Sequence, residues 1–140
     1  MPKIAFIGEC MLELSGAQPD AVVGAAKLGF AGDTLNAATY MARTSRLIDR
    51  AAQNVASYIT ALGTDAYSDA MISSWQNDGI ATDLVRRIDG ALPGLYTIQT
   101  DATGERSFSY WRDQAAAKQM LGGGHDGKIR AEFSGFDGLY

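Results

Sequence analysis

Two tyrosines and an arginine are the residues of this sequence best suited to bind a ligand. Tyr96 lies in segment 95–100, and Tyr110 and Arg112 lie in segment 106–112. Both segments have the alternating pattern of strands, in which side chains two residues apart share a face. A guanidinium in line with two phenols suits a polar anionic ligand, whereas half-buried packing is the other interpretation of the tyrosines.

The turn-rich stretch between these segments, 101–105, predicts a β-hairpin. If residues 102–104 form a three-residue loop with Gly104 in the left-handed conformation, Asp101 faces Glu105 and the pairing is fixed from there. The register then pairs Thr100 with Arg106, Ile98 with Phe108, and Tyr96 with Tyr110. One face of the hairpin is expected to carry Tyr96, Ile98, Phe108, Tyr110 and Arg112.

Residues 29–36, with the sequence GFAGDTLN, form a second candidate binding segment. Glycines before a helix allow a ligand to approach the backbone, and the first-turn N–H groups are free donors for hydroxyls or a carboxylate. The same residues also fit an ordinary capped helix start. Both interpretations stay open at this point.

Two further motifs are weak. Residues 122–128 resemble a phosphate-binding loop, but Ile129 stands where Ser or Thr must hold magnesium, and the preceding segment reads as helix. A flexible connector is the better interpretation. His125 is the only histidine and has one nearby acid, so we expect neither a metal site nor catalysis from it.

The elements that position these residues alternate between strand and helix. Apolar runs at 4–7 and 55–62 predict strands buried on both faces, as in a parallel sheet. A helix is expected between them over about 33–50, and Asp65 is expected to cap another that ends near Gly79. This alternation indicates an α/β fold with a doubly wound sheet.

Glu9 and Glu13 lie just past the first predicted strand. Ligands of open α/β sheets often bind beyond the carboxyl ends of strands. A polar contact to a substrate and a solvated turn are equally open interpretations. Towards the C-terminus, we expect a short helix over 114–121, a loop over 122–127 and the start of a buried strand within 133–140.

Composition limits the possible partners. The 140 residues carry 12 Lys and Arg against 16 Asp and Glu, a net charge of −4, with an isoelectric point near 4.8. Without a basic face we expect neither nucleic acid nor a membrane as partner, but a small molecule. Cys10 is the only cysteine and no run reaches about 18 apolar residues, so we expect a cytoplasmic protein.

Several blocks in order resemble the N-terminal part of a ribokinase-like carbohydrate kinase of the phosphofructokinase-B type, and most of all the members that phosphorylate 2-keto-3-deoxygluconate. The likeness runs from residue 3 to about 121. The blocks are IAFIGECMLEL at 4–14, GFAGDTLN at 29–36, ITALGTD at 59–65, LPGLY at 92–96, TGER at 103–106 and SYWR at 109–112.

The resemblance implies a three-layer α/β/α sandwich with a small β-sheet lid over the sugar pocket, the lid strands lying at about 22–31 and 84–112. It implies that Gly32, Asp33 and Asn36 line a sugar-acid pocket. Tyr96, Tyr110 and Arg112 would reach that pocket from the lid. Ala31 stands where relatives often have a glycine.

The resemblance also implies ATP and Mg²⁺ as cofactors of an intact enzyme. The Gly-Ala-Gly-Asp signature that carries the catalytic base in this family does not occur in residues 1–140, so the sequence predicts an incomplete kinase domain with no catalytic residue and no activity alone. The alternatives are a fragment of a fructokinase-like or other sugar kinase, and a non-catalytic module that assembles through the lid, with a homo-oligomer as one form of that assembly.

Overall fold

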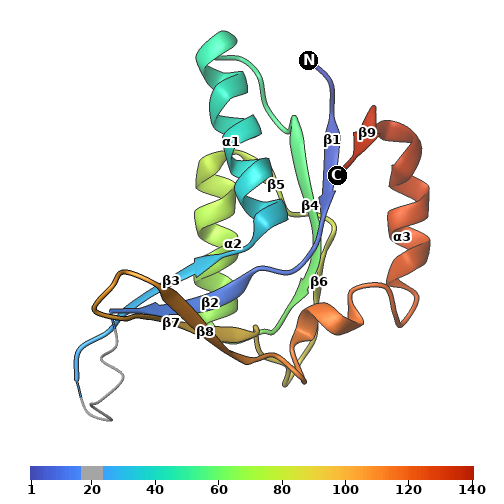
Figure 1. The fold of residues 1–140 in the computed structure, drawn as a ribbon. Helices are drawn as coiled ribbons and strands as arrows, with labels where there is room; N and C mark the ends of the chain where they lie inside the picture. Colours follow the sequence, from blue (N-terminus) through green and yellow to red (C-terminus); the bar gives the residue numbers. More distant parts are fainter. Residues whose placement is uncertain (17–23) are drawn as a thin grey trace.

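The computed structural model describes residues 1–16 and 24–140, and its centre is a parallel sheet (Figure 1). The strand order is β5-β4-β1-β9, and β6 pairs with the carboxyl-terminal half of β4. The strands are β1 (Ile4–Ile7), β4 (Ala56–Leu62), β5 (Ile80–Ala81), β6 (Val85–Arg87) and β9 (Gly138–Leu139). Every residue of β4 is buried, because helices cover both faces of the sheet.

Helices α1 (Asp33–Ile48) and α2 (Ala66–Asp78) pack on one face of this sheet, and α3 (His125–Glu132) lies on the other (Figure 1). The larger hydrophobic cluster joins the sheet to α1 and α2 through Leu35, Ala38, Met71 and Trp75, among others. A smaller cluster joins the sheet to α3 through Ala5, Ile59, Leu84 and Ile129. The three-layer α/β/α arrangement expected from the sequence is therefore confirmed.

Helix α2 begins and ends where the sequence predicted, because both of its ends carry local signals. The Asp65 carboxylate accepts hydrogen bonds from the backbone N–H groups of Tyr67 and Ser68, at 3.0 and 3.1 Å. Gly79 ends the helix in the left-handed conformation, with φ of 86°. Both ends are thus fixed by local chemistry that a sequence displays directly.

A second, four-stranded sheet extends from the carboxyl end of β1 and has the order β3-β2-β7-β8 (Figure 1). Its strands are β2 (Met11–Ser15), β3 (Lys27–Ala31), β7 (Leu95–Thr100) and β8 (Arg106–Trp111). The β7–β8 hairpin has the predicted register, with Tyr96 opposite Tyr110 and Ile98 opposite Phe108. Gly104 is left-handed, with φ of 87°, as the three-residue loop requires.

The predicted bounds of this small sheet need three corrections. A lid strand was predicted over about 22–31, but β3 begins at Lys27. Residues 22 and 23 of that prediction lie outside the described part of the chain. The 84–112 prediction included β6, which instead pairs with β4 because Leu84 and Val85 are apolar and become buried against the central sheet. The prediction also omitted β2, a half-buried strand that pairs with both β3 and β7.

The C-terminal region also differs from the expectation. The predicted loop is interrupted at His125, which begins α3 and is hydrogen-bonded through Nε2 to the Leu84 carbonyl, 3.0 Å away. Burial of Ile129 in the small core cluster stabilises this helix despite Gly127 within it. In place of the short helix predicted over 114–121, the structure has a 3₁₀ turn at Ala116–Gln119. A second 3₁₀ turn, Phe133–Gly135, precedes the short strand β9.

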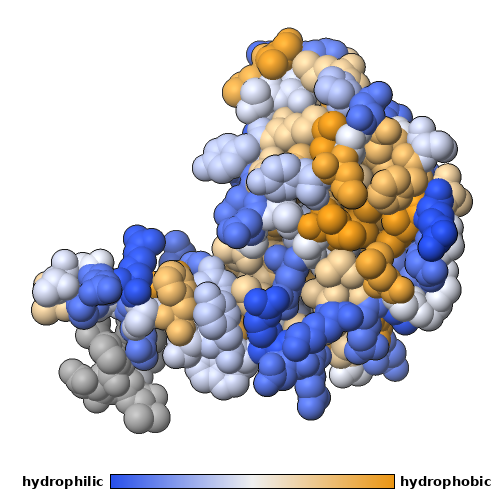
Figure 2. All heavy atoms as spheres, turned by 45° about the vertical axis from the view of Figure 1, so that its right-hand side comes forward, coloured by the Kyte–Doolittle hydropathy of each residue, from blue (hydrophilic) through white to orange (hydrophobic). Residues whose placement is uncertain are grey.

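Figure 2 brings forward the side of the molecule that carries α3 and β9, and shows a large apolar area there, bordered by hydrophilic side chains. Partly exposed apolar residues near the C-terminus include Phe133, Leu139 and Tyr140. Within the described residues, β9 is the last strand in the sheet order on this side. No helix of the described chain has the length and apolar character needed to cross a bilayer.

Candidate functional site

A cavity of about 640 Å³ lies where the small sheet meets the carboxyl end of β1 and the beginning of α1. All of the predicted site residues line it: Gly32, Asp33, Asn36, Tyr96, Tyr110 and Arg112. Residues from two segments sixty or more positions apart in the chain are thus brought together around one hollow. Its position beyond the end of a parallel strand is where open α/β sheets bind ligands.

The beginning of α1 forms one wall of the cavity. Gly32 precedes the helix in an extended conformation, and a Cβ atom there would lie 2.3 Å from the Glu9 carbonyl oxygen. The glycine is therefore required by close packing of α1 against the segment after β1, rather than only by ligand approach. Asp33 and Asn36 are exposed in the first turn, where their polar groups face the cavity.

The hairpin forms the opposite wall with an aromatic surface. The ring centres of Tyr96 and Tyr110 are 5.9 Å apart, and Phe108 lies 6.2 Å from Tyr96 and 6.4 Å from Tyr110. These rings come from the predicted face of the hairpin. Tyr96 is 9% exposed, whereas Tyr110 is 54% exposed, so only the first ring is part of the packed interior.

The tyrosine on β7 is held by an acid on the neighbouring strand. The Tyr96 hydroxyl donates a short hydrogen bond to the Glu13 carboxylate, and Glu13 lies opposite Tyr96 in the β2–β7 pairing. Burial of the ring, together with this carboxylate, raises the pKa of Tyr96 above its ordinary value. The phenol therefore stays protonated near neutral pH and orients Glu13 towards the cavity.

Arg112 makes an ion pair across the junction of the two sheets. Its Nη2 atom lies 2.5 Å from Oε2 of Glu9, in the segment that links β1 to β2. The Glu9 side chain is only 12% exposed, whereas that of Arg112 is 48% exposed. The cation predicted to bind an anionic ligand is thus already in contact with an anion of the chain.

Thr34, in the first turn of α1, lines the cavity and contacts a buried polar group. The hydroxyls of Thr34 and Tyr58 lie 3.1 Å apart, and Cys10 is buried in the same core cluster as Tyr58. Desolvation by burial raises the pKa values of Cys10 and Tyr58; the Glu9 charge adds to the effect at Cys10, and the hydrogen bond to Thr34 opposes it at Tyr58 without outweighing it. Both groups stay protonated near neutral pH, so this buried group helps to position α1 and supplies no base.

The cavity has further charged residues that the sequence did not assign to it. Arg106 lines it because it shares a strand face with Tyr110 and Arg112, and that even spacing was a usable signal. Glu9 and Glu13 line it as well, so the polar-contact interpretation of these two residues fits better than a solvated turn. The ion pair of Glu9 with Arg112 had no signal in the sequence, since it joins residues far apart in the chain.

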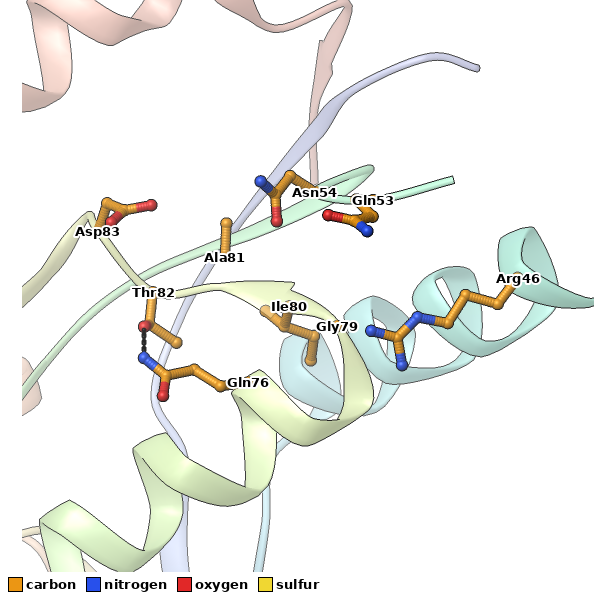
Figure 3. Close-up of a pocket in the computed structure, with 9 residues that line it drawn as sticks. All are labelled: Arg46, Gln53, Asn54, Gln76, Gly79, Ile80, Ala81, Thr82 and Asp83. Carbon is orange, nitrogen blue, oxygen red and sulfur yellow. Dashed lines mark hydrogen bonds between the residues drawn. The ribbon is translucent and has the colours of Figure 1, made fainter. Parts of the chain in front are cut away.

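Another hollow, of about 340 Å³, lies near the amino ends of β4 and β5 (Figure 3). Its lining includes Arg46, Asn54 and Asp83, and the Gln76 amide donates to the Thr82 hydroxyl at 2.8 Å. None of the predicted site residues lines it. The two hollows therefore lie at opposite ends of the central strands.

The described residues do not form a cluster that could hold the metal ion expected for a kinase. Within residues 1–16 and 24–140, no group of three or more His, Cys, Asp or Glu side chains is placed to hold a metal ion. The Lys128 ammonium group donates to the Asp83 carbonyl on the far side of the central sheet from α1, away from the cavity. The geometry of the cavity therefore supports binding of a small polar ligand.

Comparison with known families decides the broader assignment. The pattern described as pfkB family carbohydrate kinase matches residues 1–122. The chain belongs to the pfkB family of carbohydrate kinases. The match covers almost the same residues as the resemblance noted from the sequence blocks. Every residue that lines the cavity lies within it.

Curated relatives of this pfkB chain share a name. The 2-dehydro-3-deoxygluconokinases of Dickeya dadantii strain 3937 and Escherichia coli K12 are each 49% identical to it over 138 residues. That of Haemophilus influenzae is 46% identical over 140 residues. Each match covers 99% or 100% of this chain but 42% of the relative, so the chain spans less than half the length of these proteins.

Solved structures of the pfkB type share the fold. A fructokinase from Xylella fastidiosa is 30% identical, with a TM-score of 0.66, covering 82% of this chain and 34% of that protein. A 2-dehydro-3-deoxygluconokinase from Thermotoga maritima has a TM-score of 0.67 at 23% identity, covering 84% and 34%. The ribokinase-like assignment of the fold is confirmed by these similarities.

Proposed function

We propose that this chain is the sugar-acid-binding part of an ATP-dependent kinase that phosphorylates 2-keto-3-deoxygluconate, also called 2-dehydro-3-deoxygluconate. The observation that carries the proposal is the cavity that joins Arg112 and two phenols to the beginning of α1. The names of the curated relatives support the same substrate. Because those relatives are longer, the phosphoryl transfer itself is assigned to the longer protein.

In this proposal each wall of the cavity has a separate task. Arg112 binds the carboxylate of the sugar acid, and Tyr96 and Tyr110 contact its hydroxyl and carbonyl oxygens. Asp33 and Asn36 bind further hydroxyls from the first turn of α1. Closure of the small sheet over the sugar would keep water away from the transferred phosphoryl group.

Calorimetric titration of the full chain with 2-keto-3-deoxygluconate tests the binding role. Arg112→Ala should weaken binding by about a hundredfold, since a charge-assisted contact contributes about 2 to 3 kcal/mol. Arg43→Ala is the matched control, because Arg43 pairs with Asp78 at 2.9 Å and lies outside the cavity. Equal affinities of wild type and Arg112→Ala would contradict the proposal.

A chimera tests the assignment to a kinase. The chain would replace its matching segment in the Escherichia coli K12 relative, with which it is 49% identical. We expect ATP-dependent phosphorylation of 2-keto-3-deoxygluconate by the folded chimera and none by the chain alone. Phosphorylation by the purified chain alone would overturn this division of roles.

A second candidate is a kinase for a neutral sugar such as fructose. It is favoured by the 30% identity and the TM-score of 0.66 to the Xylella fastidiosa fructokinase. A neutral sugar has no carboxylate for Arg112, so Arg112→Ala would leave its affinity nearly unchanged. Titrating both variants with fructose and with the sugar acid separates the two candidates.

A non-catalytic assembly role is the remaining candidate. Strand β8 is an edge of the small sheet and is exposed along its whole length, which is the geometry for pairing with another chain. Size-exclusion chromatography of the chain over a range of concentrations tests this role. A strictly monomeric profile would contradict it.

A further inference from the structure

Among residues 1–16 and 24–140, the Glu9–Arg112 ion pair is the one direct charge contact of the predicted anion-binding cation. Arg112 follows β8 on the small sheet, and Glu9 follows β1 on the central sheet. Their 2.5 Å contact therefore links the two sheets beside the cavity that both residues line. Any anion that binds Arg112 must come close to the Glu9 carboxylate.

The surroundings of Glu9 hold it in place. Its side chain is 12% exposed, and a Cβ atom on Gly94 would lie only 2.7 Å from Oε1. The Gly94 carbonyl in turn accepts the Leu12 N–H at 2.8 Å, so this backbone is tied to β2. Arg112, with a long side chain that is 48% exposed, is the partner with freedom to move.

The charge of Glu9 depends on Arg112 for compensation. Oε1 of Glu9 is buried and has no hydrogen-bond partner within the described residues, and Arg112 is the cation in contact with Oε2. If Arg112 turns towards a ligand, a largely buried carboxylate loses its counter-ion, which is unfavourable. A ligand carboxylate and Glu9 therefore compete for one guanidinium.

We propose that Glu9 sets the affinity of the site for the acid: it is an internal carboxylate that occupies Arg112 until the carboxylate of the substrate replaces it. This inference rests on the proposed sugar-acid function. Ligands without a carboxylate cannot make the exchange, so they leave the Glu9–Arg112 contact intact and gain nothing from Arg112. Glu9 thus lowers the affinity for the acid.

The test uses titration of the full chain with 2-keto-3-deoxygluconate and with the neutral analogue in which a hydroxymethyl group replaces the carboxylate. Glu9→Gln keeps the shape and removes the charge, so the acid should bind about threefold to tenfold more tightly, the range expected for a partly exposed ion pair. Affinity for the neutral analogue should be unchanged.

One mutant background and one control variant separate competition for Arg112 from general charge effects. In Arg112→Ala the Glu9→Gln change should have no effect on acid affinity, because the shared guanidinium is gone. Asp113→Asn is the matched control: it removes the same charge one residue from Arg112, but on a fully exposed side chain paired with Lys118 at 3.8 Å. It should leave acid affinity unchanged.

Weaker or unchanged acid binding in Glu9→Gln would overturn the proposal, since Glu9 would then orient Arg112 or play no part. Equal tightening in Asp113→Asn or in the Arg112→Ala background would overturn it as well. Thermal unfolding checks the fold of each variant. If Glu9→Gln does not fold, Glu9→Asp replaces it: the shorter carboxylate withdraws from Arg112, and acid binding should tighten in the same direction.

The outcomes also distinguish this inference from the function on which it rests. If the wild type binds the acid and Arg112→Ala weakens that binding, the proposed function stands whatever Glu9→Gln does. If the wild type binds the acid no better than the neutral analogue, and Arg112→Ala changes nothing, the proposed function itself fails.

Discussion

The central sheet and the small sheet bury their residues to very different extents. Strand β4 is buried throughout and has helices on both faces, whereas β8 is exposed throughout and lies at an edge. One region is thus stabilised by a continuous core, and the other presents aromatic rings and cations to a cavity. The difference indicates that stability and ligand binding are largely separated in this chain.

Removal of a core aromatic should show the largest effect. Trp75 is 1% exposed and packs edge-on against Tyr58, with ring centres 5.1 Å apart, so Trp75→Ala should reduce the free energy of unfolding by about 3 to 5 kcal/mol. Phe108→Ala on the small sheet, where the ring is 47% exposed, should cost about 1 kcal/mol. Urea unfolding measures both, and equal losses would contradict the separation.

A substitution at the junction of the two regions should have an intermediate effect. Gly32→Ala places a Cβ 2.3 Å from the Glu9 carbonyl, so the backbone must shift, at about 1 to 3 kcal/mol. Gly29→Ala is the matched control, because nothing lies within 4 Å of a Cβ there. We expect the first variant alone to lose stability and sugar-acid affinity together; loss of neither would contradict the close packing.

The cap of α2 should contribute less and should depend on pH. Burial opposes ionisation of Asp65, but hydrogen bonds from Ser68 and Tyr67 outweigh it and lower its pKa. A lowered folded-state pKa stabilises the protein above the unfolded value, about 3.9, and this contribution is lost as pH falls through the folded value. Asp65→Ala should therefore cost about 1 kcal/mol at pH 7 and less at pH 3.

Asp65→Asn separates the cap from its charge. Asn also caps helices well, so this variant should keep most of the stability at neutral pH and lose the pH dependence. Urea unfolding at both pH values gives the comparison. A loss in Asp65→Ala that is the same at pH 7 and pH 3 would show that the carboxylate charge has no part in it.

The smallest change should come from the tip of the hairpin. Oδ1 of the exposed Asp101 accepts bonds from the Thr103 and Glu105 N–H groups at 2.8 and 3.0 Å. Asp101→Ala should speed hydrogen exchange of these amides and leave those of β4 unchanged, whereas Asp101→Asn keeps an acceptor and should show little effect. Faster exchange throughout β4 would mean that the two regions unfold as one unit.

Local chemistry made much of the fold predictable. The apolar runs of β1 and β4, the Asp65 cap and the Gly79 stop each have a signal within a few residues, and each prediction was confirmed. The hairpin register was also predictable, because Gly104 and the turn around it fix the pairing of every residue beyond.

Predictions failed where partners come from distant parts of the chain. β2 has little pattern of its own and exists because β3 and β7 pair with both its edges. The predicted loop over 122–127 took in the first turn of helix α3, since glycines disfavour helix, yet burial of Ile129 against Ala5 and Ile59 stabilises this helix. Likewise β6 was assigned to the small sheet although Val85 is buried against β4.

The sequence by itself determined the α/β class, the hairpin and the face on which Tyr96, Tyr110 and Arg112 lie, because those features depend on periodicity and turn chemistry. Only the tertiary structure decided that this face and the beginning of α1 share one cavity, and that Arg112 is already paired with Glu9. A sequence encodes the local preference of each segment for helix, strand or turn, whereas the contact between residues 9 and 112 exists only once the two sheets meet.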